Sequence, residues 1–523
     1  MRTRFPHLRP WSRGLPATVA AAALLATTAC DGQPAEASSG TTSTLSLAIL
    51  GSPNSFDPTQ LSEGQQAYIW ESLYDTLLQL DNKGELRPGA AESWKYSADA
   101  RTLTLKLRHG MTFSSGAPVT SAAVKATLDR TRTASGPTQV QLAAVSTVTA
   151  PDDHTVVLKL KQPDGALLSA LSAAAGVIGD PKTMTSKIAA LDPVGSGPYT
   201  LDKGTTVNGS VYVLKRRDDH WNKKTYPFET VKIRVIADHT AAVNALKAGE
   251  INAGSVGAEQ VGTLKSAGFD VEHVRATSAG TLVLADRAGT VLEPLKDVRV
   301  RKAINMAFDR EKIAQRILRG SGGPTVQMFN PKGDAYDPAL EKTYTHDPAE
   351  ARKLLAEAGY SNGFSVTMPS LFFTKPFEPT IAQALADIGI KVKWDTVPAQ
   401  QSVSALMSKK YPMFFVADGL GPTPMEVRNF FSPNGYRNVF HSTDPRLDKL
   451  LSKANSALDP AEAAKAYKEI NTFAVENAWN APVFQVGTDW VTKKGIAYLG
   501  DGSSTFSSIR QFGIADQAPE DSP

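Results

Sequence analysis

The sequence has 523 residues, of which 41% are hydrophobic and 21% charged, and this excludes a disordered, fibrous or polytopic membrane protein. The formal net charge is only +4, so the composition gives no basic footprint for nucleic acid and no acidic tract. The single cysteine, Cys30, excludes internal disulfides and cysteine-rich zinc sites. At roughly 150 residues per domain, the length indicates about three domains.

The first 29 residues predict a signal peptide. Four arginines precede an apolar, alanine-rich run at 15–29, which is shorter than the roughly 20 residues that a membrane-spanning helix needs. The end of the run, Thr27-Thr28-Ala29-Cys30, resembles a bacterial lipobox, although Thr27 stands where leucine is usual. The resemblance implies that Cys30 is lipidated; the alternative is a plain cleavage region with an incidental cysteine.

Residues 30–44 are polar and rich in Gly, Ser, Thr and Ala. Such a segment buries too little apolar surface to offset its ordering entropy, so it predicts a flexible linker behind the lipid anchor. The mature protein is therefore expected outside the cytoplasm, anchored to the cell membrane by lipidated Cys30. At the other end, 516–523 predict a flexible tail.

Between these ends, strand-like and helix-like patterns alternate. β-rich runs predict strands at 44–50, 103–107, 156–160, 211–214, 231–235 and 413–416. Asp-Pro pairs at 347–348, 444–445 and 459–460 predict three helix starts, because Asp caps free N–H groups and Pro has no N–H to leave unpaired. A strand at 231–238, a helix at 239–249 and a strand at 251–255 predict a parallel βαβ unit. The chain is therefore predicted to be α/β.

Motifs for catalysis and metal binding are absent. The sequence has no HExxH, no Walker A loop and no GxGxxG that opens a helix after a strand. Ser196 in Gly195-Ser196-Gly197 lacks the spacing of a nucleophile elbow and predicts a turn. The histidines are scattered without i,i+4 pairs. We therefore expect no catalytic residues, no metal site and no cofactor, although a carboxylate pair built from distant segments stays open.

Several blocks, in order along the chain, resemble the family 5 extracellular solute-binding proteins of ATP-driven importers, the oligopeptide-, dipeptide- and nickel-binding group. The turn at 195–199, Gly-Ser-Gly-Pro-Tyr, is similar to the family's Gly-Thr-Gly-Pro-Tyr. The other similar blocks lie at 55–58, 84–94, 105–120, 297–310 and 448–451. Together they cover the chain from about 45 to 495.

The resemblance implies an α/β, two-lobed fold like that of periplasmic binding proteins (type II, in the large family 5 form), with an extra domain inserted in lobe one. The implied parts are a lobe I core at 45–67, 190–280 and 488–515, an inserted domain at 68–189, and lobe II at 281–487. Crossovers near 280 and 487 would form a hinge, so that the lobes close around a ligand.

Ligand-binding residues are also implied by the resemblance. In peptide-binding relatives, strands from both lobes pair with an extended peptide, and an Asp holds its ammonium group. The matching segments are 51–56 and 415–419, and Asp418 takes the Asp position if a small insertion follows Gly419; an ungapped alignment puts Leu420 there instead. The expected ligand-binding residues are Ser52, Asn54, Ser55, Phe56, Asp286, Ala417, Asp418, Gly419 and Arg437. For Asp286 and Arg437 the alternative is a surface or turn role.

Two classes of function stand at this point. The first is a membrane-tethered, monomeric, non-enzymatic receptor that delivers an oligopeptide or peptide-like solute to an ABC permease and binds no nucleic acid. Within this class the alternatives are an oligosaccharide, an amino-acid conjugate, a signalling peptide or, least favoured by the dispersed histidines, a nickel chelate. The second class is a secreted lipoprotein hydrolase, which turnover of a ligand would reveal.

Overall fold

The structure is a computed structural model that describes residues 43–186, 188–503 and 507–517. The predicted signal peptide and Cys30 lie outside these residues, so the predictions made for them are untested. None of the helices in the described part combines the length and apolar character needed to cross a membrane. The same part of the chain contains no group of His, Cys, Asp or Glu side chains arranged to hold a metal ion.

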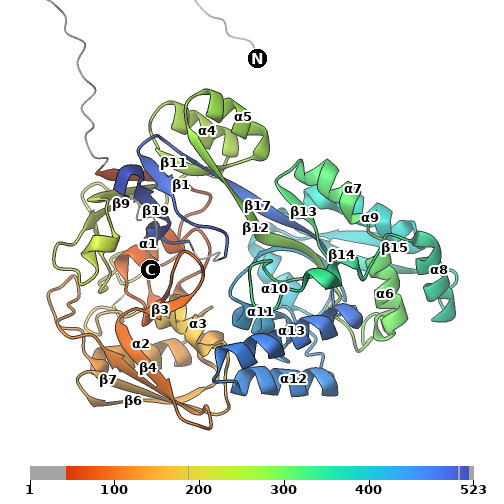
Figure 1. Ribbon diagram of the computed structural model, residues 1–523, viewed down its shortest axis with the longest axis horizontal. Coiled ribbons are helices and arrows are strands. Elements are labelled where there is room, and N and C mark those ends of the chain that lie inside the picture. Colours follow the sequence, from red (N-terminus) through yellow and green to blue (C-terminus); the bar gives the residue numbers. More distant parts are fainter. Residues whose placement is uncertain (1–42, 187, 504–506, 518–523) are drawn as a thin grey trace, which may run out of the picture. The chain divides into compact units, whose positions relative to one another are not determined.

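The largest sheet in the described part of the chain is mixed and nine-stranded (Figure 1). In spatial order its strands are β16 (Phe414–Gly419), β12 (Asp270–Val283), β17 (Ala481–Thr492), β11 (Ala253–Val256), β1 (Thr44–Ile49), β10 (Thr230–Val235), β9 (Val211–Arg216) and β8 (Tyr199–Leu201), with β13 (Gly322–Pro324) also paired to β17. Smaller two-stranded sheets pair β2 (Leu78–Leu80) with β3 (Leu86–Pro88), β14 (Phe364–Ser370) with β15 (Ile390–Thr396), and β18 (Ile496–Tyr498) with β19 (Phe512–Ile514).

The parallel βαβ unit is confirmed, with one strand inserted between its two strands. Helix α4 (His239–Lys247) connects β10 to β11, and Asp238 caps it by accepting a hydrogen bond from the backbone N–H of Ala241. Strand β1 lies between β10 and β11 and is parallel to both, since Leu47 pairs with Ile233 and with Ala253. The N-terminal strand thus completes the unit that the pattern at 231–255 predicts.

The second sheet is antiparallel throughout. Its order is β4 (Ala91–Tyr96), β5 (Thr102–Leu107), β7 (Thr155–Leu160) and β6 (Val145–Asp152). In β5 the alternating residues Leu103, Leu105 and Leu107 are buried, as period-two patterning predicts for a sheet with one face against a core. Helix α2 (Ser121–Thr133) begins at its cap Thr120, whose side chain accepts from the N–H of Ala123.

All three predicted Asp-Pro helix starts are confirmed. Asp347 caps α8 (Pro348–Glu357), Asp444 caps α12 (Pro445–Ser456) and Asp459 caps α13 (Pro460–Glu476), each by accepting backbone N–H groups of the first turn. The other helices are α1 (Ala67–Leu73), α3 (Leu167–Leu171), α5 (Ala258–Ser266), α6 (Val298–Met306), α7 (Arg310–Ile313), α9 (Glu378–Ala386), α10 (Ser402–Met407) and α11 (Thr423–Phe431).

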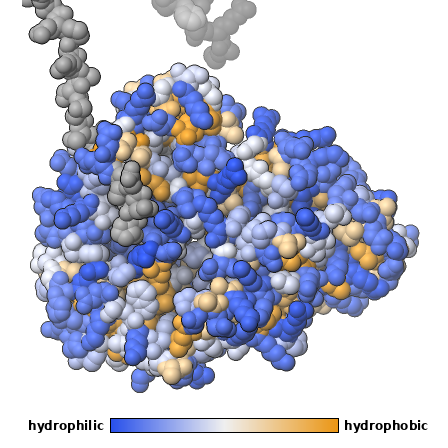
Figure 2. Space-filling model, in the orientation of Figure 1, coloured by the Kyte–Doolittle hydropathy of each residue, from blue (hydrophilic) through white to orange (hydrophobic). Residues whose placement is uncertain are grey.

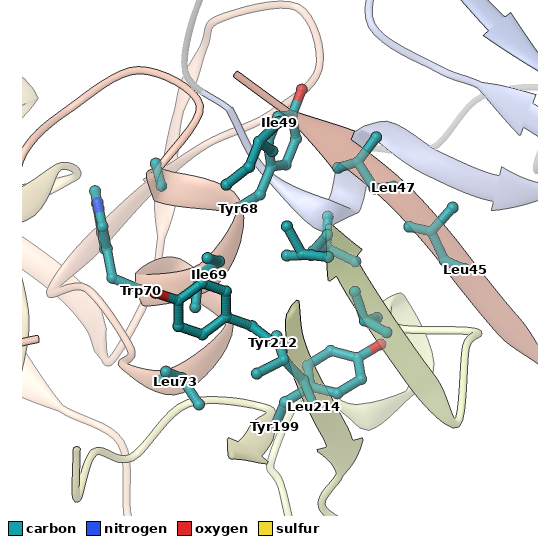
Figure 3. Packing of buried hydrophobic residues seen from close by; sticks show 14 of the residues in the cluster. Leu45, Leu47, Ile49, Tyr68, Ile69, Trp70, Leu73, Tyr199, Tyr212 and Leu214 are labelled. Atoms are coloured by element: carbon teal, nitrogen blue, oxygen red, sulfur yellow. The ribbon is translucent and has the colours of Figure 1, made fainter. Parts of the chain in front are cut away.

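Separate hydrophobic clusters divide these elements into two lobes. We call residues 43–280 and 488–517 the first lobe, and 281–487 the second lobe. In the first lobe, α1 packs against β1, β8 and β9, and Figure 3 shows Tyr68, Ile69 and Leu73 among the side chains of this cluster. A second cluster lies under the antiparallel sheet. The second lobe has its own clusters around α6, α8 and β14 and around α11, α12 and α13. On the face that Figure 2 shows, hydrophilic residues dominate and hydrophobic ones form small patches.

Two long strands, β12 and β17, run between the lobes (Figure 1). Their antiparallel register shifts between the pairs Val274–Thr488 and Ser278–Val486. Within this irregular stretch Ala276 has a positive φ of 54°, which is uncommon for a residue with a side chain. The bulge therefore interrupts the ladder at the place where the chain passes from one lobe to the other.

The Gly195-Ser196-Gly197 turn is a packing feature. A Cβ atom at Gly195 would lie 2.2 Å from the carbonyl oxygen of Leu73, and one at Gly197 would lie 2.5 Å from the carbonyl carbon of the same residue. Only glycine allows the turn to approach the end of α1 so closely. Ser196 itself is 1% exposed. This agrees with the predicted turn and leaves the hydroxyl inaccessible to a substrate.

Candidate functional site

A cavity of about 420 Å³ is walled by residues of both lobes. From the first lobe it is lined by Glu63, Gly64, Gln65, Tyr68, Val274, Thr277, Ser278, Thr488, Trp490, Tyr498, Ser507 and Gln511, and from the second by Gly419, Gly421, Pro422, Met425, Glu426 and Asn429. A larger groove of about 660 Å³ lies along α12 and α13, but it is open and formed by the second lobe alone. Enclosure by both lobes makes the smaller cavity the candidate site.

One wall of the cavity is aromatic. The ring of Trp490 in β17 stacks on Tyr498 with centroids 4.9 Å apart, and Tyr68 in α1 meets Trp490 edge to face at 6.0 Å. Trp490 is 6% exposed, so its position is fixed by packing. A fixed aromatic surface of this kind offers apolar area and a π face to a bound solute.

Glu426 reaches the cavity from the first turn of α11. It is 5% exposed, and its only hydrogen bond in the described part of the chain comes from the backbone N–H of Gly421, at 2.7 Å to Oε1. Burial raises the pKa of Glu426 to about 8, and nearby Asp418 adds to the rise, while the Gly421 N–H and Arg437 oppose it. The carboxyl group is therefore mostly protonated at neutral pH in the absence of a bound cation.

Glu63 reaches the cavity from the opposite lobe, in the loop before α1. Its Oε1 accepts from the N–H of Ala174 at 3.0 Å, and its buried Oε2 has no partner among the described residues. Burial raises the pKa of Glu63 to about 7, with a further rise from Glu71; the Ala174 N–H and the Gln141 side chain oppose it. Neither cavity carboxyl group thus forms an ion pair with a residue in the described part of the chain.

Asp418, the predicted ammonium anchor, forms an ion pair with Arg437. The guanidinium donates from Nε to Oδ2 at 2.7 Å and from Nη2 to Oδ1 at 2.5 Å, a bidentate arrangement. Burial would lower the pKa of Arg437, but Asp418 outweighs it, so the pKa is raised. Arg437 also lies over the ring of Tyr436, 4.3 Å from its centroid. At 7% exposure Arg437 is buried, so a turn role in solvent is wrong for it.

Of the other predicted ligand-binding residues, Gly419 lines the cavity and the rest are not among its lining residues. Ser52 Oγ is 2.9 Å from the hydroxyl of Tyr212, Ser55 Oγ accepts from the N–H of Asp57, and Phe56 is buried against Tyr212. Asn54 and Ala417 are exposed. No ligand is present to test these residues, so their contact with solute stays a prediction.

Asp286 is wholly buried rather than on the surface. Its carboxylate accepts hydrogen bonds from the N–H and hydroxyl of Thr290 at 2.8 Å and from the N–H groups of Val291 and Leu292 at 2.6 and 2.8 Å. A carboxylate that fastens a turn in this way is already occupied. Its surface role is therefore wrong, and the structure gives it no place in the cavity wall.

The sequence reasoning missed Glu63, Glu426 and Trp490. One signal was available for Glu426, since it comes soon after the segment 415–419, which resembles a ligand-binding segment of peptide-binding relatives. Glu63 and Trp490 lie outside every motif, and only the fold brings them to the same cavity.

A second set of contacts joins the lobes beside the cavity. Arg428 of α11 donates from Nη1 to the carbonyl of Gln141 at 3.2 Å and lies 3.8 Å from Asp164. The N–H of Gly165 donates to Asn455 Oδ1 at 3.2 Å. We call these residues the latch. Burial lowers the pKa of Arg428, opposed by Asp164. The latch holds the antiparallel sheet's side of the first lobe against α11 and α12.

Comparison with known proteins identifies the family of the chain. Residues 85–439 match the family model of bacterial extracellular solute-binding proteins, family 5, middle part. The chain belongs to this family. The chain is similar to the glutathione-binding protein GsiB of Escherichia coli K12, with 27% identity over 445 residues that cover 81% of this chain and 85% of GsiB.

Solved structures agree on the fold. The binding protein AgaA of A. tumefaciens R10, solved with agropinic acid, superposes with a TM-score of 0.77 at 26% identity, over 90% of this chain and 98% of AgaA. DppA of Helicobacter pylori, solved with the peptide STSA, gives a TM-score of 0.77 at 21% identity with the same coverage. The two-lobed α/β fold and the family prediction are thus confirmed, and the chain is an extracytoplasmic solute-binding protein of the kind that serves ABC importers.

Proposed function

We propose that this family 5 protein is a lipid-anchored receptor that captures a short peptide or peptide-like solute between its lobes and delivers it to an ABC permease. The observation that carries the proposal is the cavity of about 420 Å³ with walls from both lobes. A ligand there would contact both lobes only when they are together, so binding free energy would favour closure. Lipidation of Cys30 would supply the anchor.

The size and lining of the cavity favour a small solute over a long peptide. Its volume is near the lower end of the range of about 300–1,000 Å³ for small-molecule sites. Its wall combines aromatic rings with carboxyl, amide and hydroxyl groups. The names of similar proteins point the same way, because GsiB is named for glutathione and AgaA was solved with agropinic acid.

We also propose that the hinge lies at the bulge in β12 and the facing part of β17. Both strands pass between the lobes, and the register shift at 274–278 lies near the predicted crossovers at 280 and 487. We propose the lobe boundaries at the same places, and this is supported by hydrophobic clusters at 45–74 with 199–253 and at 77–178 that share no residue with those at 282–486. A few residues in an irregular ladder are a suitable place for rotation.

The proposal predicts that protein purified from its own cells carries a small molecule, which native mass spectrometry detects. After unfolding, dialysis and refolding, returning that molecule at 100 times its Kd should add about 2.7 kcal/mol to the free energy of unfolding. Trp490→Phe should weaken binding, whereas Trp94→Phe, in the distant antiparallel sheet, should leave it unchanged. Conversion of the molecule into a product on incubation would favour a hydrolase instead.

A further inference from the structure

The ionisable side chains that line the cavity are two carboxyl groups and two phenols. They belong to Glu63, Glu426, Tyr68 and Tyr498, and no lysine, arginine or histidine is among the described residues that line the wall. Neither carboxyl group forms an ion pair with any residue in the described ranges; the N–H groups of Ala174 and Gly421 donate to them, and the Gln141 side chain also lowers the pKa of Glu63. The cavity therefore presents unneutralised acidic groups to whatever enters it.

Each carboxyl group keeps one oxygen without a partner. Glu426 is 95% buried, being 5% exposed, and hydrogen bonds only through Oε1. The Oε2 atom of Glu63 is buried without a partner in the described part of the chain. Burial of an ionised carboxylate is unfavourable unless a cation or several hydrogen-bond donors compensate it. Two such groups, one from each lobe, at a single cavity indicate that the compensating partner comes from outside the protein.

The charged neighbours of these two groups are already paired with others. On the side of Glu63, Glu71 of α1 binds Arg510 at 2.5 Å. On the side of Glu426, Arg437 binds Asp418 in the bidentate pair described above. The nearby cations therefore do not reach the cavity, and Asp418 is not free to hold an ammonium group. The negative charge that remains available belongs to Glu63 and Glu426.

Building on the proposed function, we infer that the captured solute carries a cationic group, an ammonium or guanidinium, that binds Glu426 of the second lobe and Glu63 of the first lobe together. A cation shared by both carboxylates removes the desolvation penalty of each and links the lobes at the same moment. The rings of Trp490 and Tyr68 beside it add a cation–π contribution. Closure of the two lobes thus depends on a positive charge on the solute.

This arrangement makes binding depend on pH. The pKa values of about 7 for Glu63 and about 8 for Glu426 mean that both groups are mostly protonated at pH 6, and that Glu426 is still mostly protonated at pH 7. A cation prefers the ionised forms, so binding in that range must release protons and the affinity should rise from pH 6 to pH 8. The charged groups that face the two carboxyls, Glu71, Asp418 and Arg437, are paired, and the phenols of Tyr68 and Tyr498 stay neutral throughout because their pKa values are raised.

The test uses matched peptides that differ only in charge. The refolded, solute-free protein is incubated with equimolar Gly-Arg and Gly-citrulline, both free and N-acetylated, and native mass spectrometry measures which peptides it retains at pH 6 and pH 8. Among the N-acetylated peptides, which carry no α-ammonium, the arginine peptide should be retained at least tenfold better than its citrulline isostere at pH 8, and by a smaller factor at pH 6; free Gly-citrulline, which keeps its ammonium, should be retained better than its acetylated form. The citrulline side chain keeps the shape and loses the charge. Glu426→Gln and Glu63→Gln should each reduce this preference several-fold, whereas Glu259→Gln, at an exposed position of α5, should preserve it.

Folding of the variants has its own readout. The pKa of Glu426 is raised from 4.5 in the unfolded chain, so this carboxyl group increasingly destabilises the fold as the pH rises toward its folded-state pKa. The melting temperature of Glu426→Gln should therefore be about 1–3 °C above that of the parent at pH 8 and equal to it at pH 4.5. Equal retention of the N-acetylated arginine and citrulline peptides, or a preference that survives in both glutamine variants, would overturn the inference while leaving the receptor function intact. Retention of no peptide, together with no co-purifying solute, would reject both.

Discussion

Replacing Asp418 by alanine is expected to lower the free energy of unfolding by about 3–5 kcal/mol. Arg437 is 7% exposed and would stay buried without the carboxylate that accepts two of its hydrogen bonds. Its Nη1 already lacks a partner among the described residues, so no spare acceptor is at hand. Chemical denaturation of the parent and the variant measures the loss.

A double-mutant cycle separates the ion pair from other roles of Asp418. Arg437→Met in the Asp418→Ala background removes the buried charge as well as its partner and should recover about 2 kcal/mol or more. Glu469→Ala, which breaks the more exposed pair with Lys453, should change stability by less than about 1 kcal/mol. If Asp418 anchors a ligand ammonium instead, Asp418→Ala would leave the free energy of unfolding unchanged. It would weaken the binding of peptides with a free amino group and leave the binding of N-acetylated peptides unchanged.

Arg310→Leu is the second substitution expected to have a large effect, at least about 3–5 kcal/mol of destabilisation. The guanidinium of this 6%-exposed residue donates to the carbonyls of Thr325 and Pro482 at 3.0 and 2.9 Å and to the carbonyl and side chain of Asn305 at 2.9 and 3.0 Å. These acceptors belong to α6, β17 and the segment after β13. Leucine would leave all of them buried without a donor.

Two control variants make the Arg310 prediction specific. Arg310→Lys should recover little of the lost stability, because one ammonium group cannot replace a planar guanidinium that donates hydrogen bonds to acceptors on several elements. Arg316→Leu, at an exposed position close by in the chain, should change the free energy of unfolding by less than about 0.5 kcal/mol. An Arg310→Leu protein as stable as the Arg316→Leu protein would show that water or backbone movement replaces the lost donors.

Local patterns predicted much of the fold. The Asp-Pro caps of α8, α12 and α13 and the alternation in β5 depend on neighbouring residues, and each is confirmed. The resemblance to family 5 supplied the two-lobed arrangement, because no local pattern states which elements share a lobe. The parallel partnership of β1 with β10 and β11 was likewise beyond local patterning, since it joins distant segments.

The site was less accessible to sequence reasoning. Asp286 and Arg437 were predicted to bind a ligand, yet both are buried and bound by groups of the protein itself, and Arg310 is buried and bound by a carbonyl far along the chain. Glu63 and Glu426 come from opposite lobes, so only the folded chain shows that they share a cavity. Burial and pairing decide whether a carboxylate is free for a ligand, and neither property can be read from a motif.

Reversible closure of the lobes is tested most directly by the distance between spin labels placed across the latch. Val140 beside Gln141 and Leu458 beyond Asn455 are exposed by 57% and 48%, so Val140→Cys and Leu458→Cys in a Cys30→Ser chain would accept labels without disturbing a core. Solute-free protein should show a broad population at longer distance, which the returned solute converts into a narrow population at shorter distance. A single distance that saturating solute leaves unchanged would contradict capture between moving lobes.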